Sequence, residues 1–197
     1  MNFHHITCKN LKSIILLFSV LFLSVSCSAR LETVTGLKYE IDSLQKELLN
    51  YKAEKLITEM RLARFDSLDF YIYNNQKWED MSISHDDKIV VHYPNGSITV
   101  GLVPLHLESM KPLFVFAPDT KIVNHPVKFG KGDWTTVVGE MEGTFSQPMP
   151  VAYGKAIPPT GKKFKLSMCT VGHWQGGKLI EEYLFWDDLT FRNQIGI

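Results

Sequence analysis

Asp187 and His173 are the side chains of this sequence best placed for acid–base chemistry. Asp187 follows the apolar run Leu184–Trp186, and a carboxyl group held against apolar surface loses hydration, which raises its pKa. Such a group can exchange protons near neutral pH. His173 ends the preceding apolar run, and a turn at Gly176-Gly177 would fold the two runs into an antiparallel pair. We therefore expect Asp187 to be the base and His173 a donor or positioning group.

Both residues also have a structural interpretation. Asp187 precedes a helical turn predicted at residues 188–193, and aspartate is a favourable residue at the start of a helix. Strand alternation puts His173 on the same face as Lys163 and Lys165, the more polar face of its strand. On that pattern His173 faces solvent unless the interior of the sheet is polar.

Further histidines and aromatic residues are candidates for lining a ligand pocket. The set that we select combines rings from several segments: Trp134, Tyr183, Phe185, His125 and His92. Because most large aromatic side chains are simply core residues, this interpretation competes with a structural one. No two histidines have the spacing of an HExxH motif and the sequence has no CxxC, so it predicts neither a metal nor a cofactor.

The elements that would position these residues form an α+β pattern. The strand-like runs share a high content of Val, Thr and aromatic residues: 88–93, 97–100, 121–129, 134–145, 164–174 and 179–186. The wide apolar face of residues 57–73 predicts a helix that packs against a sheet. A second helix is expected from Pro104, and Pro112 should strain it or end it early. A curved sheet around the long helix would leave an open mouth for a small ligand.

Short motifs in this part of the chain resemble one known family. They are His125–Gly130, Gly143-Thr144-Phe145, Thr160-Gly161-Lys162, Glu181–Asp187 and Gln194-Ile195-Gly196. Together they look like the SnoaL-like polyketide (ester) cyclase family of the NTF2-like superfamily. The resemblance covers residues 57–197 and implies an α+β cone, a curved antiparallel sheet around helices. It also implies that Asp187 is the acid/base and that His173 is the histidine paired with it.

The N-terminus has the order of a bacterial lipoprotein signal. Lys9 and Lys12 precede the apolar run Ile14–Leu23, and small residues lead to Cys27. The run is too short to predict a membrane span. We expect residues 1–26 to be removed and Cys27 to be acylated, which would anchor the protein to a membrane of the bacterial cell envelope. An ordinary signal peptide with an incidental cysteine is the alternative.

Residues 27–56 are predicted to form a lipidated linker and a helical stalk, followed by a SnoaL-like domain at 57–197. Apolar residues in heptad spacing share one narrow seam: Val34, Leu37, Ile41, Leu44, Leu48 and Tyr51. The seam favours either pairing with a second copy, which would make a homodimer, or packing of a single amphipathic helix against its own domain.

The composition limits the kinds of partner and of covalent cross-link that this protein can have. The chain of 197 residues has 21 basic and 21 acidic side chains, and this balance argues against nucleic acid as a partner. With Cys8 removed and Cys27 acylated, Cys169 is the only free thiol expected, so no intrachain disulfide can form. Two functions stay open. One is a small-molecule cyclase or isomerase, and the other is a non-catalytic module that binds a small hydrophobic molecule or a protein at the envelope.

Overall fold

The computed structural model describes the backbone of residues 8–197 and the side chains of residue 30 and of residues 33–197. The predicted signal segment and the acylation predicted at Cys27 therefore lie outside the residues whose side chains are described. Among the described residues, no helical stretch combines the length and the hydropathy that a bilayer crossing requires. The chain divides into two compact units, residues 1–52 and 53–197.

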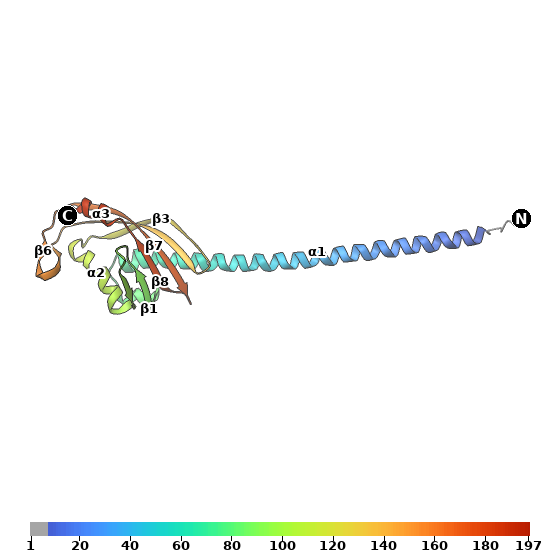
Figure 1. The fold of residues 1–197 in the computed structure, drawn as a ribbon, viewed down its shortest axis with the longest axis horizontal. Helices are drawn as coiled ribbons and strands as arrows, with labels where there is room; N and C mark the ends of the chain where they lie inside the picture. The colour runs from blue at the N-terminus through green and yellow to red at the C-terminus, as the bar shows by residue number, and fades with distance from the viewer. Residues whose placement is uncertain (1–7) are drawn as a thin grey trace. The chain divides into compact units, whose positions relative to one another are not determined.

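The described residues of the first unit, 8–52, are helical. They belong to helix α1 (Cys8–Ser67), the long helix of Figure 1. The helix is continuous through residues 27–56, where the stalk is predicted. The apolar side chains of the predicted heptad seam are exposed: Val34, Leu37, Ile41, Leu44, Leu48 and Tyr51. Use of this helix as a stalk or as a dimerisation seam stays a prediction.

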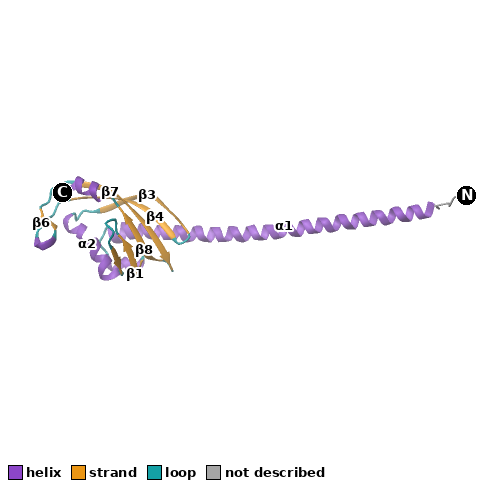
Figure 2. Cartoon of the chain, viewed as in Figure 1, coloured by secondary structure: helices purple, strands orange, loops and turns teal. Residues whose placement is uncertain are grey.

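The second unit is built on a six-stranded sheet with the order β2-β1-β8-β7-β4-β3. Its strands are β1 (His85–His92), β2 (Ile98–Val100), β3 (Lys121–Lys131), β4 (Trp134–Thr144), β7 (Lys163–Gln175) and β8 (Lys178–Phe185). Neighbouring strands are antiparallel except β1 and β8, which are parallel. Figure 2 shows them side by side. The α+β architecture predicted from the sequence is confirmed.

Short helical elements cover the sheet: η1 (Leu68–Tyr73), η2 (Trp78–Ile83), η3 (Leu102–His106), α2 (Leu107–Phe116) and α3 (Asp188–Ile195). Of the two effects expected of Pro112, strain or an early end, the early end does not occur, because α2 continues through the proline to Phe116. Proline at position 112 removes the amide that would bond the carbonyl of Glu108. Both residues are exposed, so water can solvate that carbonyl and the helix tolerates the proline.

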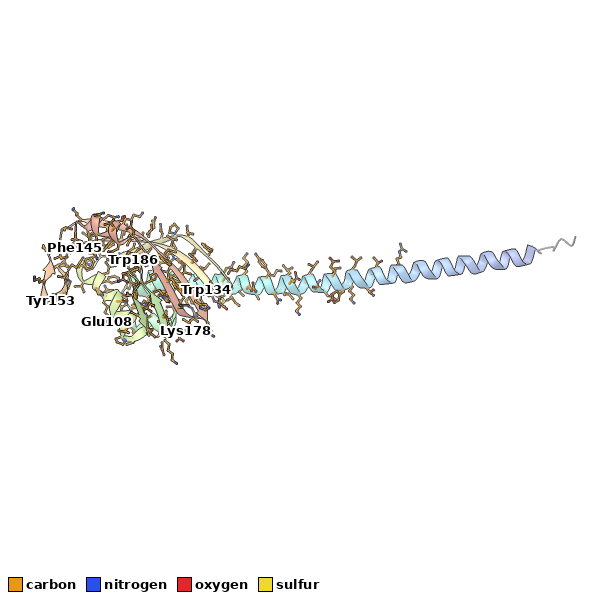
Figure 3. The ribbon with its side chains drawn as sticks, viewed as in Figure 1. Glu108, Trp134, Phe145, Tyr153, Lys178 and Trp186 are labelled. Carbon is orange, nitrogen blue, oxygen red and sulfur yellow. The ribbon has the colours of Figure 1, made fainter. Side chains whose placement is uncertain are left out.

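A separate two-stranded hairpin, β5 (Met149–Pro150) and β6 (Ala156–Ile157), carries the single turn η4 (Ala152–Gly154). Tyr153 in that turn is 98% exposed and lies at the edge of the hairpin (Figure 3). This segment is thus a surface hairpin connection.

The core lies on one face of the sheet, called here the inner face. Phe65 at the end of α1, together with Leu68 and Ile72 of η1, packs against Trp174 and Leu179. Alternation along β7 directs Trp174 inward and His173 to the opposite, outer face, as its polar pattern predicts. The position of a residue in a strand therefore decides whether its side chain reaches the core or the solvent.

Candidate functional site

A cavity of about 280 Å³ lies between the inner face of the sheet and the helical elements η1 and α2. Most of its lining is apolar and includes Leu68, Met110, Leu113, Met141, Leu166 and Leu184. The charged and titratable side chains in the lining include Asp69, His85, His106 and Glu182. A pocket with apolar walls and a few convergent polar groups is the usual form of a small-molecule site.

Three of these polar residues form the inner cluster, which consists of His85, His106 and Glu182. His85 begins β1, His106 ends η3, and Glu182 lies on β8. The Oε2 atom of Glu182 is 3.5 Å from Nε2 of His85 and 3.9 Å from Nε2 of His106. At most 5% of each of the three side chains is exposed. Burial of a carboxylate at this depth is costly unless other groups compensate its charge.

The surroundings shift the pKa values within the inner cluster. Burial acts to raise the pKa of the Glu182 carboxyl, but the facing His85 and His106 outweigh it and hold that pKa below its ordinary value. Burial also lowers the pKa of His106 to about 4, against the opposing charge of Glu182. The ring of His106 is therefore neutral at pH 7, while Glu182 is ionised.

A second charged group is the Asp–His–Asp bridge, in which His125 of β3 joins Asp66 and Asp69. Nδ1 of His125 is 2.8 Å from Oδ1 of Asp66, and its Nε2 is 2.8 Å from Oδ2 of Asp69. The His125 side chain is 2% exposed, and its ring lies against Phe70 with the ring centroids 4.5 Å apart. Lys128 also pairs with Asp66. Asp69 is the member of the bridge that lines the cavity.

Burial and charge set the protonation of this bridge. Burial raises the pKa of the Asp69 carboxyl, and the hydrogen bond to His125 offsets this only in part. Burial acts to lower the pKa of His125, but the hydrogen bonds to Asp69 and Asp66 outweigh it, so the net pKa is raised. Burial acts to raise the pKa of Asp66, yet Lys128 and His125 bring it below its ordinary value. Asp69 is thus a buried carboxyl with a raised pKa inside the cavity.

Three of the residues predicted to line a ligand pocket, His92, Tyr183 and Trp134, lie at an outer cluster formed by His92, His173 and Glu181. Oε1 of Glu181 is 2.9 Å from Nε2 of His92, and Oε2 is 3.7 Å from Nδ1 of His173. The ring of Tyr183 stacks on His92 and that of Trp134 on His173, with centroids 4.1 and 4.2 Å apart. These residues come together as an aromatic and charged patch, but on the outer face of the sheet.

The expected convergence of Asp187 and His173 in one pocket is not found. Asp187 is exposed and caps α3, where its carboxylate accepts hydrogen bonds from the amide and the hydroxyl of Thr190. These hydrogen bonds lower its pKa, contrary to the rise expected from the neighbouring apolar residues. His173 pairs with Glu181 in the register of β7 and β8, roughly 20 Å along the strands from Asp187. Neither residue lines the cavity.

Two other sequence predictions have mixed outcomes. Phe185 is 53% exposed on β8 and does not line the cavity. His125 does not line it either, but its partner Asp69 does. The sequence did not single out Asp69, His85 or Glu182. Alternation along β8 was a usable signal for Glu182, because of two consecutive glutamates in a strand one must face inward.

The sequence profile of SnoaL-like polyketide cyclases matches residues 66–195, and the chain belongs to this family. A candidate SnoaL-like polyketide cyclase from Jannaschia sp. CCS1 has 18% identity and a TM-score of 0.61, with coverage of 71% of this chain and 93% of that one. IdmH, a candidate polyketide cyclase from Streptomyces antibioticus, also has 18% identity, with a TM-score of 0.58 and coverage of 70% and 99%.

A candidate polyketide cyclase from Xanthomonas campestris pv. campestris has 8% identity, a TM-score of 0.60 and coverage of 71% and 99%. At these identities the solved structures establish the NTF2-like fold rather than an activity. No protein of curated function matches the sequence.

Proposed function

We propose that the globular unit is an acid–base enzyme, a cyclase or isomerase, that acts on a small and largely apolar carbonyl compound. The cavity of about 280 Å³ has mostly apolar walls, which suits such a substrate. The observation that carries the proposal is Asp69, a carboxyl group in the cavity wall with a raised pKa. A base whose pKa lies closer to neutrality is better matched to proton transfer at pH 7.

In the proposed step, ionised Asp69 takes a proton from a carbon next to the substrate carbonyl, and the electron pair of the C–H bond forms an enolate. In an isomerisation, Asp69 returns the proton to a different carbon. In a cyclisation, the enolate carbon forms a bond to a second carbonyl carbon, and the oxygen of that carbonyl takes up the proton. His125 donates to Asp69 and is itself held by Asp66, so it is a positioning residue.

The proposed base is thus Asp69 and not Asp187, the residue expected from the sequence. The carboxylate of Asp187 is exposed and bonded to Thr190, so it has no apolar surroundings to raise its pKa. His173 faces the outer side of the sheet, away from the cavity lining. The geometry therefore favours Asp69 over the pair expected from the sequence.

The test is deuterium exchange at the carbon next to the carbonyl in a panel of small ketones and keto esters, followed by NMR in D₂O. Asp69→Asn should lower the protein-catalysed exchange rate by about 10²- to 10⁴-fold. Asp187→Asn is the matched control and should leave that rate unchanged. Equal exchange by the wild type and by Asp69→Asn would refute Asp69 as the base.

A non-catalytic binding module is the second candidate, favoured by the bridge itself, because structural ion-pair networks also shift pKa values. Mass spectrometry of small molecules that co-purify with the native protein distinguishes the candidates. Recovery of an apolar molecule without an exchangeable α-proton, together with no exchange activity on the panel, would favour binding alone.

We also propose that the protein is held at a bacterial cell envelope by acylation of Cys27, which rests on the order of the N-terminal residues. Cys27→Ala should move the protein from the membrane fraction to the soluble fraction. Unchanged fractionation would contradict the anchor.

A further inference from the structure

We propose that the inner cluster of His85, His106 and Glu182 is a binding site for one divalent transition-metal ion of the zinc type. The side chains offer two imidazole nitrogens and one carboxylate oxygen, which is a common ligand set for catalytic zinc. No sequence motif indicates this site, because the three residues come from segments far apart in the chain.

The ligand atoms converge on one point. Nε2 of His85 and Nε2 of His106 both face the same atom, Oε2 of Glu182, at 3.5 and 3.9 Å. All three ligand atoms lie within 4.8 Å of one another. A tetrahedral ion with ligand distances of about 2.1 Å separates its ligands by about 3.4 Å. The cluster therefore needs little movement to close around an ion.

Hydrogen bonding leaves the ligating nitrogen of His85 without a proton when the ring is neutral. Ser84 Oγ donates its proton to the carbonyl of Met81 and lies 2.9 Å from Nδ1 of His85. With the single hydroxyl proton of Ser84 assigned to the Met81 carbonyl, Nδ1 is the donor in the second contact. The assigned tautomer carries its proton on Nδ1, so the lone pair of Nε2 is directed at Glu182.

The hydroxyl protons around His106 also determine the tautomer of its ring. Ser109 Oγ donates to the carbonyl of His106, so the hydroxyl of Tyr93 donates to Ser109 across 2.6 Å. Tyr93 then accepts from Nδ1 of His106 at 3.0 Å, and Nε2 of His106 is left with its lone pair. Metal-bound histidines are typically held by such a hydrogen bond at the other ring nitrogen.

With both rings neutral in these tautomers, the two lone pairs and a carboxylate oxygen would face one another in a buried place. Without a bound cation this arrangement is repulsive unless an extra proton is taken up, whereas a divalent ion converts all three contacts into attraction. The three residues also line the cavity, so an ion held by them would keep one position open toward a water or a ligand. A role for that ion in polarising a substrate carbonyl would depend on the proposed function, but binding of the ion does not.

The outer cluster has the same residue types in a different arrangement. His92 and His173 contact different oxygens of Glu181, and Tyr183 also donates to this carboxylate. Glu181 and Glu182 are adjacent in β8, so one substitution at each position gives a matched pair of variants.

The experiment uses full-length protein that has been treated with a chelator and then titrated with Zn²⁺ and, for its visible absorption, with Co²⁺. Wild type should bind one ion and give the intense visible bands of low-symmetry Co²⁺. Glu182→Gln should weaken Zn²⁺ binding by about 100-fold or more, while Glu181→Gln should change it by less than about twofold.

No saturable binding by the wild type would overturn the proposal, and so would equal affinities of the Glu182→Gln variant and the wild type. An equal loss in Glu181→Gln would assign the ion to the outer face and would also overturn it. If Glu182→Gln does not fold, as judged by circular dichroism, His106→Phe removes a ligand and must give the same large loss. Because Zn²⁺ binding is read directly, a failure here is distinct from a failure of the exchange assay.

Discussion

Glu181 and Glu182 are neighbours in β8, and each lies between two histidines, but one cluster is outside the sheet and the other inside. The side chain of Glu181 is 28% exposed, against 5% for Glu182. Glu181 receives a hydrogen bond from Tyr183 and is open to water, whereas Glu182 is buried and forms its ion pairs with His85 and His106. Strand alternation therefore places one of these glutamates in contact with water and the other in the buried interior, although both have histidine neighbours.

The energetic contrast follows from burial. A partly exposed ion pair contributes little to the free energy of unfolding, typically between about 0 and 1 kcal/mol. A buried charge that loses its partner costs about 3–5 kcal/mol. Substitutions inside the cavity should thus have large effects on stability, and equivalent ones on the outer face should have small effects.

The largest expected difference in the free energy of unfolding is between the His125→Ala and His92→Ala variants. The first variant leaves Asp69 buried without its hydrogen-bond partner and should lower the free energy of unfolding of the globular unit by about 3 kcal/mol. The second removes a partly exposed contact to Glu181 and should cost less than about 1 kcal/mol. Urea unfolding measures both. Equal losses of unfolding free energy in the two variants would mean that burial does not make the inner face more sensitive to substitution than the outer face.

The pH dependence of stability should sharpen the contrast. The pKa of His125 is raised in the folded protein, so its stabilising effect is complete below pH 6.5 and is lost as pH rises through the folded value. Asp69 and Asp66 are the carboxylates that face His125, and Lys128 is the nearby cation. Between pH 6.5 and 9, the free energy of unfolding should fall more in the wild type than in His125→Phe. If the free energy of unfolding has the same pH dependence in both proteins, deprotonation of His125 does not control stability in this range.

The smallest effect is expected from Glu181→Gln, a change of less than about 1 kcal/mol in the free energy of unfolding that shrinks further at high salt. Unfolding at two salt concentrations measures it. A loss above about 2 kcal/mol that salt does not alter would show that the outer cluster is energetically buried, and the comparison between the two faces would fail.

Much of the fold could be predicted because it depends on local patterns. The alternating runs at residues 134–145 and 164–174 identify strands, and the wide apolar face of residues 57–73 identifies a helix on a sheet. The effect of Pro112 on its helix could not be predicted, because tolerance of a proline depends on solvent reaching one carbonyl. That is a tertiary property rather than a local one.

The site could be predicted only in part. The apolar neighbours of Asp187 favour an acid–base role, but an aspartate directly before a helical segment is also a typical helix cap, and that local role prevails. His85, His106 and Glu182 share no spacing that a motif could capture, because the pairing of β1 with β8 and the packing of η3 against β1 bring them together. Asp69 lies within a helical apolar pattern, where a single acidic residue resembles a solvent-facing position.

The strand order has a consequence for how the protein is made. β8 is the last strand in the chain, yet it occupies a place between β1 and β7 in the sheet. The early hairpin of β1 and β2 therefore has no edge to join until nearly the whole polypeptide has left the ribosome. Nascent chains that stop before residue 178 should expose an unpaired edge to chaperones and proteases, and a premature stop late in the gene would remove the centre of the sheet rather than its margin.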